Sequence, residues 1–460
     1  MDILKFGGTS VSSKDSLYNI LRILSSYNSG DKSVIMVVSA LKGVTNQLTR
    51  IINLVNNKNN EYEVVFQEIK SFHADFIEKV LPLNAQILMK NMLGLLEEEY
   101  QAYLKELFEQ GSVTARDKDR ILCFGELCSA QIIRMFLEVN GINFGLLDAR
   151  KVILTDDNYG SANVNWPITR KRIKDFFRVS PGNYVITGFI GASAHGCTTT
   201  LGRGGSDYTA TVFATILNAE NVIKWTDVNG IMTADPGKVP DSYSLNKITY
   251  DQLLCLSKFG SNVLVHENSI QKLQQDNIPL IIKNTFNTNF EGTLVTNTTN
   301  TRHKAISHHT DCHIVSFQKN LKISKEVYNQ IKANNYLFFR IKNDQFNQTD
   351  SSVYLVSDEC LKYLSTIYCC KNPGCNSCKK PKDSKVIYES ITLITIATNQ
   401  KDKIFEEKRI LDLLNKKGIN ILCTRLFKNG ISLILQQEEA KDTLNYLHNE
   451  IVLRTEEKVC

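Results

Sequence analysis

The 460-residue sequence lacks any apolar run long enough to span a lipid bilayer, and it shows no amino-terminal signal peptide. Met1 instead leads directly into an apolar segment that is typical of a buried strand. We therefore expect a cytoplasmic protein that has no membrane partner.

Clusters of basic residues interleaved with aromatic residues are also missing. The formal net charge is only +6, and the lysines are scattered along the chain. Scattered lysines are typical of a solvated surface, so nucleic acid is not an expected partner. Hydrophobic residues at 42% and charged residues at 22% indicate a globular protein. A chain of 460 residues predicts two or three domains.

Paired cysteine motifs are scarce, although the chain has 12 cysteines. Most are isolated within apolar stretches, as Cys123 and Cys255 are, which is typical of reduced thiols in a reducing cytoplasm. Four cysteines lie close together: Cys369, Cys370, Cys375 and Cys378. They could hold Zn²⁺, but a zinc ribbon needs two C-x₂-C pairs and only one is present. A variable surface loop is the favoured interpretation, so no metal site is predicted.

A glycine-rich stretch, TGFIGASAHGCTTTLGRGGSDYT, is the most informative part of the sequence. It runs from Thr187 to Thr209, after the apolar run Tyr184–Ile190, and leads into a helix predicted over Asp207–Leu217. A glycine loop between a strand and a helix aims backbone N–H groups at an anion. Arg203 can pair with a carboxylate or phosphate, and Asp207 fits if it orients a lysine or binds a metal. The alternative is a tight turn with an aspartate N-cap.

Strand, turn and helix signals alternate over the first 300 residues. Such alternation predicts an α/β fold with a mainly parallel sheet. Glu61 to about Arg120 is rich in Glu, Leu and Lys and predicts an inserted helical subdomain, a lid. The run Thr293–Arg302 predicts a domain boundary. The predicted strands are Ile3–Phe6, Val34–Ser39, Phe144–Asp148, Tyr184–Ile190, Val222–Thr226 and Leu280–Lys283.

The last third of the chain has a different order of elements, βαββα. A hairpin signal, Asn429-Gly430, separates two of its strands, and Ile451–Arg454 predicts a final strand. This order predicts a ferredoxin-like βαββαβ module, and Cys312–Asp358 is a weaker copy of it. The remaining elements are predicted at Ser390–Ala397, Phe405–Lys416, Gly418–Thr424, Ile431–Gln436 and Glu438–Asn449.

Four loops follow predicted strands, and ligands of parallel sheets bind at the carboxyl ends of strands. In Lys5-Phe6-Gly7-Gly8-Thr9-Ser10, the glycines would let the backbone approach phosphates, and Lys5 would supply positive charge. The spacing is not that of a Walker A loop, so the usual nucleotide-triphosphatase folds are not favoured. A plain strand–helix turn is an equal alternative for this motif alone. The other loops are Ser39–Asn46, Gly188–Asp207 and Thr226–Gly230.

Seven motifs occur in the order found in one family: KFGGTS, SALKGVTN, GEL, DARK, TTTLGRGGSDYTA, WTDVNGIMTADP and FGSNVLVHE. The chain resembles aspartate kinases of the amino-acid kinase superfamily, strongly over about Met1 to Val295. The resemblance implies a three-layer αβα catalytic domain at 1–300, with the lid at about 61–120. It also implies a regulatory region at 301–460 with two ACT-type modules, at about 305–385 and 386–460.

The reaction implied by this resemblance transfers the γ-phosphoryl group of ATP to the side-chain carboxylate of L-aspartate. The product, 4-phospho-L-aspartate, begins the route to lysine, threonine and methionine or to diaminopimelate. The carboxylate is already ionised at neutral pH, so charge neutralisation and positioning carry the catalysis. Mg²⁺ would enter with ATP. ACT-type modules usually pair between chains, so a homodimer or higher homo-oligomer is expected.

The resemblance also implies roles for individual residues. Lys5 bridges the transferring phosphoryl group and Asp207 holds Lys5 in place. Arg203 pairs with a carboxylate of aspartate, and Glu126 takes its α-ammonium group. The implied aspartate site comprises Ser39, Thr45, Glu126, Arg203, Gly204, Gly205 and Ser206. The implied nucleotide site comprises Gly7, Gly8, Thr9, Ser10, Thr226, Asp227, Met232, Asn262 and Val263.

Three positions depart from the family pattern, all on the nucleotide side. Gly237 stands where the family commonly has arginine, Asn262 replaces a nucleotide-facing lysine, and Met232 replaces a tyrosine-like residue. Two alternatives therefore stay open: another amino-acid kinase of this fold, such as one acting on glutamate, or a non-catalytic amino-acid sensor. The retained Lys5 and Asp207 argue against the sensor.

An amino-acid effector at the ACT-type modules is a further expectation, but its identity is not evident. Lysine-sensitive family members carry a glycine-containing loop and an acidic strand in the first module. Here these stretches read Gln318–Ile323 and Tyr336–Ile341, where Lys322 and Arg340 would repel a lysine. We expect L-lysine to inhibit weakly or not at all. A titration of L-lysine, L-threonine and L-methionine at sub-saturating aspartate checks this.

Overall fold

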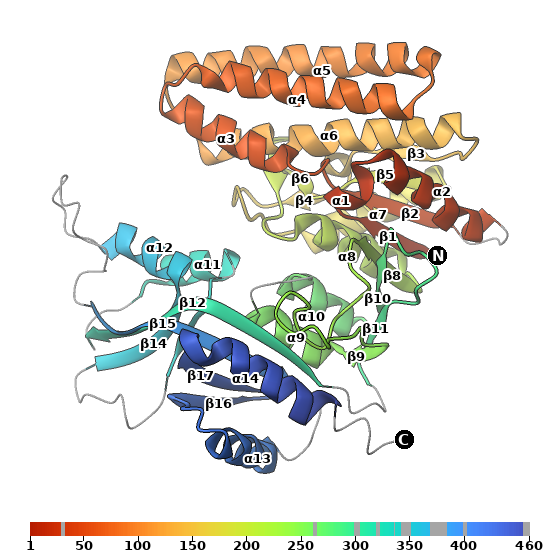
Figure 1. Cartoon of the computed structure of the whole chain (residues 1–460). Helices are drawn as coiled ribbons and strands as arrows, with labels where there is room; N and C mark the ends of the chain where they lie inside the picture. Colours follow the sequence, from red (N-terminus) through yellow and green to blue (C-terminus); the bar gives the residue numbers. More distant parts are fainter. Residues whose placement is uncertain are drawn as a thin grey trace. The chain divides into compact units, whose positions relative to one another are not determined.

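The computed structural model describes residues 1–28, 33–260, 265–298, 304–318, 323–334, 336–341, 351–368, 384–398 and 403–453 (Figure 1). The chain divides into two compact units. The first contains Met1–Gly230 and Gln271–Leu294, and the second contains Ile231–Ile270 and Val295–Cys460. The predicted boundary near residue 300 differs from this division, because Ile231–Ile270 belongs to the second unit.

A parallel sheet forms the centre of the first unit. Strand β1 (Asp2–Phe6) lies between β2 (Val34–Val38) and β8 (Asn221–Thr226), and every residue of β1 and β2 is buried. Strands covered on both faces are nearly all apolar, which explains β2 and the apolar residues of β1. The order is β3-β5-β2-β1-β8-β10-β11. The outer strands are β3 (Gly145–Leu147), β5 (Tyr184–Thr187), β10 (Leu280–Asn284) and β11 (Thr293–Thr296). The predicted mainly parallel sheet is confirmed.

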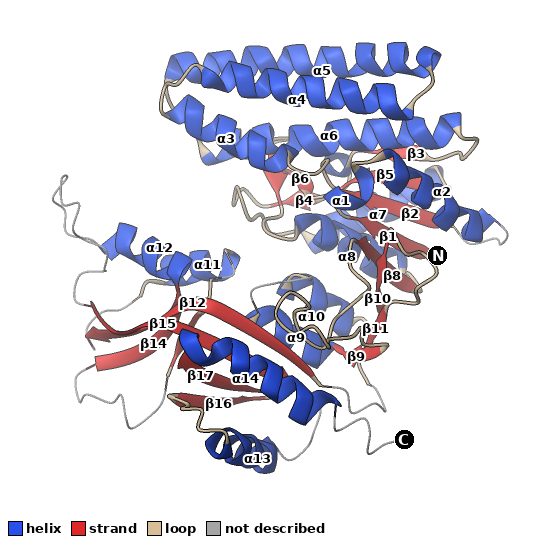
Figure 2. Cartoon of the chain, viewed as in Figure 1, coloured by secondary structure: helices blue, strands red, loops and turns tan. Residues whose placement is uncertain are grey.

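Helices of the first unit pack against this sheet (Figure 2). Helix α8 (Gly205–Leu217) packs against β1, β2 and β8, while α6 (Ala115–Val139) packs against β2, β3 and β5. Helix α6 therefore covers the β3–β5 side of the sheet, α8 covers the β1–β8 side, and both contact β2. The remaining helices are α1 (Gly8–Val11), α2 (Lys14–Asn28), α3 (Val44–Asn56) and α7 (Trp166–Val179).

Two long helices, α4 (Glu61–Val80) and α5 (Leu83–Gln110), fill most of the predicted helical insertion. They pack against each other, and α3 and α6 pack against them (Figure 1). Helix α6 begins with a capping box in which Thr114 and Asp117 satisfy each other's backbone N–H groups. The same helix carries Glu126, so the insertion leads directly into a predicted site residue.

The predicted strand Tyr184–Ile190 is two strands in the structure. Strand β5 ends at Thr187, and β6 (Ile190–Ser193) joins a second sheet with β4 (Leu154–Thr155) and β7 (Thr198–Thr200). The break lies at Gly188 and Phe189, where Phe189 has φ +71°. A Cβ atom at Gly188 would lie 2.8 Å from the Val38 carbonyl oxygen, so the turn requires glycine. Helix α8 also starts at Gly205, two residues before its predicted start.

The second unit contains a six-stranded antiparallel sheet of order β13-β14-β12-β15-β17-β16. Strand β12 (Ala305–Gln318) pairs with β15 (Ser384–Ala397) and joins two βαββα halves. This arrangement confirms the predicted pair of ferredoxin-like modules. The other elements are β13 (Phe338–Arg340), β14 (Ser351–Ser357), β16 (Cys423–Phe427), β17 (Gly430–Gln436), α11 (Lys325–Ala333), α12 (Asp358–Tyr368), α13 (Lys403–Lys416) and α14 (Ala440–Leu447).

Two predictions in the last module are wrong. The strand predicted at Gly418–Thr424 begins only at Cys423. The final strand predicted at Ile451–Arg454 is absent from the described residues, because His448–Leu453 continues α14 as a π-helical turn. Ile451 and Val452 are buried in the same hydrophobic core as Leu447, so these two β-branched residues form part of the buried face of a helix.

Three shorter elements precede these modules: β9 (Lys247–Thr249), α9 (Tyr250–Phe259) and α10 (Glu267–Gln275). The cysteine cluster Cys369–Cys378 lies outside the described residues, as does Lys319–Lys322. In the parts of the chain that the structure describes, no helix is both long and apolar enough to cross a membrane.

Candidate active site

Two lysines and one aspartate form a charged cluster on one face of the parallel sheet. Lys5 of β1 is in register with Lys224 of β8, so both side chains emerge on the same face. Asp207, in the first turn of α8, lies between them. Its Oδ1 is 2.8 Å from Lys5 Nζ and its Oδ2 is 2.7 Å from Lys224 Nζ. The sequence predicted the pairing of Lys5 with Asp207 but not the participation of Lys224.

The charges of this cluster are largely shielded from water. The side chains of Lys5, Asp207 and Lys224 are 9%, 11% and 12% exposed. Burial raises the pKa of Asp207, but attraction to Lys224 and Lys5 outweighs it and lowers that pKa to about 2. Asp207 is therefore an anion at neutral pH, and it orients two ammonium groups.

An open pocket of ≈ 660 Å³ lies beside this cluster. Nine of the residues predicted as catalytic or aspartate-binding line it: Lys5, Ser39, Thr45, Glu126, Arg203, Gly204, Gly205, Ser206 and Asp207. These residues come from four separate segments of the first unit. The structure therefore brings together every residue of these two predicted groups.

The glycine loop before α8 shapes one wall of the pocket. Gly202 and Gly204 have φ values of +75° and +71°, which side-chain-bearing residues rarely adopt. A Cβ atom at Gly205 would lie 2.6 Å from the Phe189 ring. The loop thus presents Arg203 to the pocket and starts α8 at the position that places Asp207 between the lysines.

Glu126 of α6 also lines the pocket and is only 3% exposed. Its Oε1 accepts a hydrogen bond from the Ala40 N–H at 3.3 Å, whereas its Oε2 is buried without a hydrogen-bond partner among the described residues. Burial raises the pKa of this carboxyl to about 8, although the Ala40 N–H and Lys5 act in the opposite direction. A buried acceptor of this kind fits a cationic ligand group, because an ammonium would supply both hydrogen bond and counter-charge.

Asp119 is a pocket residue that sequence reasoning missed. It lies seven positions before Glu126 on α6, which places both carboxylates on one helix face. Asp119 accepts hydrogen bonds from the N–H groups of Gly160 and Thr200 at 2.9 and 2.8 Å, and from Thr200 Oγ1 at 2.8 Å. Its carboxylate therefore ties the turn at Gly160 and strand β7 to α6 and holds the pocket wall. The seven-residue spacing was the available signal.

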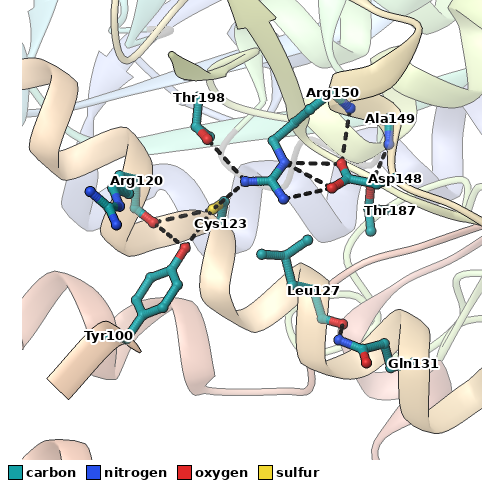
Figure 3. A network of polar contacts seen from close by, with 10 residues as sticks. All are labelled: Tyr100, Arg120, Cys123, Leu127, Gln131, Asp148, Ala149, Arg150, Thr187 and Thr198. Carbon is teal, nitrogen blue, oxygen red and sulfur yellow. Dashed lines mark hydrogen bonds and ion pairs between the residues drawn. The ribbon is translucent and has the colours of Figure 1, made fainter. Parts of the chain in front are cut away.

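A second network fixes α6 to the sheet edge (Figure 3). Arg150 donates to both carboxylate oxygens of Asp148, with Nη2 to Oδ2 at 2.6 Å, and to Thr198 Oγ1 at 3.1 Å. Its Nη1 also lies 3.9 Å from Cys123 Sγ on α6. In the structure, Asp148 and Arg150 of the DARK motif thus form a brace beside the helix that carries Glu126.

Six of the residues predicted to bind the nucleotide belong to the first unit. The Gly7 N–H and the Ser10 hydroxyl both donate to the Trp225 carbonyl oxygen at 3.3 Å, which ties the loop after β1 to the end of β8. Ser10 is buried, so its hydroxyl serves this tie. The others in the first unit are Gly8, Thr9, Thr226 and Asp227. Met232 belongs to the second unit, and Asn262 and Val263 lie outside the described residues.

The first unit thus combines helices around a parallel sheet with a lysine–aspartate–lysine cluster beside a glycine loop. The family model for the amino acid kinase family matches residues 2–284. The chain belongs to the amino acid kinase family, and the resemblance to aspartate kinases is confirmed by curated relatives.

An aspartokinase of Chlamydia pneumoniae is 32% identical over 294 residues, which cover 64% of this chain and 62% of that protein. A chloroplastic bifunctional aspartokinase/homoserine dehydrogenase of Zea mays is 30% identical over 293 residues, 63% of this chain and 32% of that protein. The matches thus span less than two thirds of these relatives.

Solved structures share the fold over nearly the whole chain. Aspartokinase III of E. coli, in a complex with aspartate and ADP, aligns with a TM-score of 0.76 at 23% identity and covers 98% of this chain and 99% of its own. Aspartate kinase of Clostridium acetobutylicum aligns with a TM-score of 0.67 at 21% identity, with the same coverage. At these identities the likeness concerns the fold.

Proposed function

We propose that the protein is an aspartate kinase, which transfers the γ-phosphoryl group of ATP to the side-chain carboxylate of L-aspartate. The observation that carries this proposal is one pocket with two unlike halves. On one side, Glu126 Oε2 is buried without a partner and suits an ammonium group. On the other, Lys5 and Arg203 supply positive charge for anions, and Lys224 lies behind them as the second partner of Asp207. An amino acid with a second carboxylate matches this arrangement.

The chain's residues would act by positioning and by charge neutralisation. Aspartate's side-chain carboxylate is already ionised, so no general base is required. Glu126 would bind the α-ammonium group and Arg203 a carboxylate, which turns the other carboxylate towards Lys5. Lys5 would then stabilise the negative charge that is shared between the attacking oxygen and the transferring phosphoryl group.

We propose that the phosphoryl donor is ATP in complex with Mg²⁺. In the described residues, no group of three or more His, Cys, Asp or Glu side chains could hold a metal ion. Both oxygens of Asp207 already face lysines. The side chains of the site therefore fit a Mg²⁺ ion that enters bound to ATP, where it would screen the charge of the phosphates.

The pH dependence of aspartate binding should report on Glu126. The pKa of its carboxyl is raised to about 8, so in the unliganded protein it is mostly protonated below that pH. Binding an ammonium group requires the anion. We therefore expect the KM for aspartate to fall as pH rises from 6.5 to 8, by up to about tenfold per pH unit.

Steady-state kinetics between pH 6.5 and 8.5, at saturating ATP, measure this dependence. Glu126→Gln should raise the KM for aspartate and abolish the slope, because the amide does not titrate. A slope that persists in Glu126→Gln would assign the titration to another group.

The proposed function is tested by an ADP-release assay with L-aspartate, with L-glutamate and without an acceptor. We expect ADP release that depends on L-aspartate. The phosphorylated product should be trapped by hydroxylamine as an aspartyl hydroxamate. Release with glutamate instead would indicate another amino-acid kinase. ATP or aspartate binding without turnover would indicate a sensor.

Assembly, regulation and location remain predictions. We propose a homodimer or larger homo-oligomer that forms through the ACT-type modules, an amino-acid effector at those modules, and a cytoplasmic location. Light scattering of the purified chain, with and without amino acids, tests the first two.

A further inference from the structure

The cluster of Lys5, Asp207 and Lys224 holds two positive charges against one negative charge. The paired register of β1 and β8 places both lysines on one sheet face, and Asp207 contacts each with a different oxygen. The three side chains are only 9–12% exposed. The chain thus keeps a net positive charge in a nearly dry site.

Such a surplus is costly unless an anion compensates for it. Burial lowers the pKa of Lys224, and Lys5 acts in the same direction, while Asp207 offsets both only in part. Asp227 also attracts Lys224, but it lies in the exposed turn after β8. An anionic ligand at the carboxyl ends of β1 and β8 would balance this surplus charge.

Two features fit phosphate as that anion. The loop after β1 contains Gly7 and Gly8, and a Cβ atom at Gly7 would lie 3.8 Å from Lys5 Nζ, so glycine keeps the space beside the ammonium open. Lys224 also differs from Lys5 in its surroundings, because Lys5 lines the aspartate pocket and Lys224 lies on the far side of Asp207. The two ammonium groups could therefore contact a chain of phosphates that extends away from the pocket.

We propose that Lys224 is a second phosphate-binding lysine, which contacts the terminal phosphates of ATP together with Lys5. This inference rests on the proposed function, because ATP is the anion that the proposed reaction supplies. Asp207 then acts as the positioning residue for both lysines. Lys224 is the one charged residue of the strand Asn221–Thr226, and it faces the same side of the sheet as Lys5 of β1.

The variant Lys224→Met tests this role, because methionine keeps the length of the side chain and removes its charge. Calorimetric titration with ATP, ADP and AMP should show about a 10²-fold loss of affinity for ATP, a smaller loss for ADP and a change within about twofold for AMP. In turnover, kcat/KM for ATP should fall by about 10²-fold. The KM for aspartate should change by less than about threefold.

Thermal unfolding separates this role from a merely structural one. Removing Lys224 leaves a balanced pair of Lys5 and Asp207, so the unliganded variant should unfold at the same temperature as the wild type or at a higher one. The rise in unfolding temperature caused by ATP should shrink. A structural role predicts the opposite, a less stable unliganded protein.

Lys283→Met is the matched control. Lys283 lies on the neighbouring strand β10, in register with Trp225, and its Nζ is 5.4 Å from the Trp225 ring centroid on the other sheet face. This variant should keep the wild-type ratio of ATP to AMP affinity. Lys224→Arg, which keeps the charge, should retain more ATP affinity than Lys224→Met.

The outcomes also separate this inference from the proposed function. If the wild type binds ATP and phosphorylates aspartate while Lys224→Met equals it in ATP affinity and kcat/KM, the inference is overturned and the proposed function stands. Equal losses for ATP, ADP and AMP would likewise overturn it. If the wild type itself binds no ATP, the proposed function fails.

Discussion

Replacing Lys5 by methionine is expected to lower kcat for phosphoryl transfer by about 10²–10³-fold and to leave the first unit folded. Lys5 is in the pocket wall, 2.8 Å from Asp207 Oδ1, and it would stabilise charge that develops only in the transition state. Methionine fills a similar volume, and Asp207 keeps its ion pair with Lys224. The loss should therefore appear in kcat, with the KM for aspartate changed by less than about threefold.

Steady-state kinetics and thermal unfolding of the same preparation check this result. Activity within about tenfold of the wild type, a loss of only ~1.4 kcal/mol, would contradict the role given to Lys5. The double variant Lys5→Met/Lys224→Met extends the test. It leaves the buried Asp207 without either lysine, so its unfolding temperature should fall well below that of each single variant.

Lys5 and the glycine loop before Asp207 were predictable as parts of one site because they lie in recognisable local patterns, whereas Ser39, Thr45 and Glu126 were implied only by the family resemblance. Glycines before Asp207 and a lysine before Gly7-Gly8 each mark a strand end, and strand ends of a parallel sheet converge. Lys224 was not predicted as a site residue, because its proximity to Lys5 and Asp207 depends on how β8 is aligned with β1. Only the pairing of β8 with β1 shows that residues 5 and 224 share a row. A charged residue inside an apolar strand is the general signal.

Tertiary packing explains the other differences between prediction and structure. Tyr184–Ile190 reads as one apolar strand, yet Gly188 approaches Val38 and Ser206 so closely that the chain must turn there. Ile451 and Val452 have strand propensity, but the core beside Leu447 accepts them as a helical turn. In both cases local propensity yields to a contact with residues distant in the sequence. Asp119 was missed for the same reason, since its partners Gly160 and Thr200 are distant in the sequence.

A buried ion pair is a prominent electrostatic feature of the second unit. Lys304, just before β12, places Nζ 2.5 Å from Glu406 Oε1 on α13, and the two side chains are 1% and 3% exposed. Burial lowers the pKa of Lys304, while Glu406 acts to raise it. Arg409 lies one turn further along α13, 3.6 Å from the same oxygen, but is 41% exposed. Glu406 is thus the counter-charge that lets Lys304 remain buried.

Glu406→Ala is expected to destabilise the second unit by about 3–5 kcal/mol, because it leaves a buried ammonium without its partner. Lys304 can avoid this state only by losing its proton in the folded protein. The unfolded chain then binds more protons than the folded one, so the stability of the variant should rise with pH. The difference from the wild type should be largest near pH 7 and should shrink as pH approaches the ordinary lysine pKa of about 10.4.

Hydrogen exchange of peptides from β12, β15 and β17 measures opening of this unit during urea titration. Fluorescence of Trp166 and Trp225, which both belong to the first unit, gives an internal reference. The double variant Lys304→Met/Glu406→Leu is the matched control, because it replaces the pair by apolar groups of similar size and should be about as stable as the wild type. A loss below about 1 kcal/mol in Glu406→Ala, or a loss that grows with pH, would show that Lys304 reaches water or another carboxylate once Glu406 is removed.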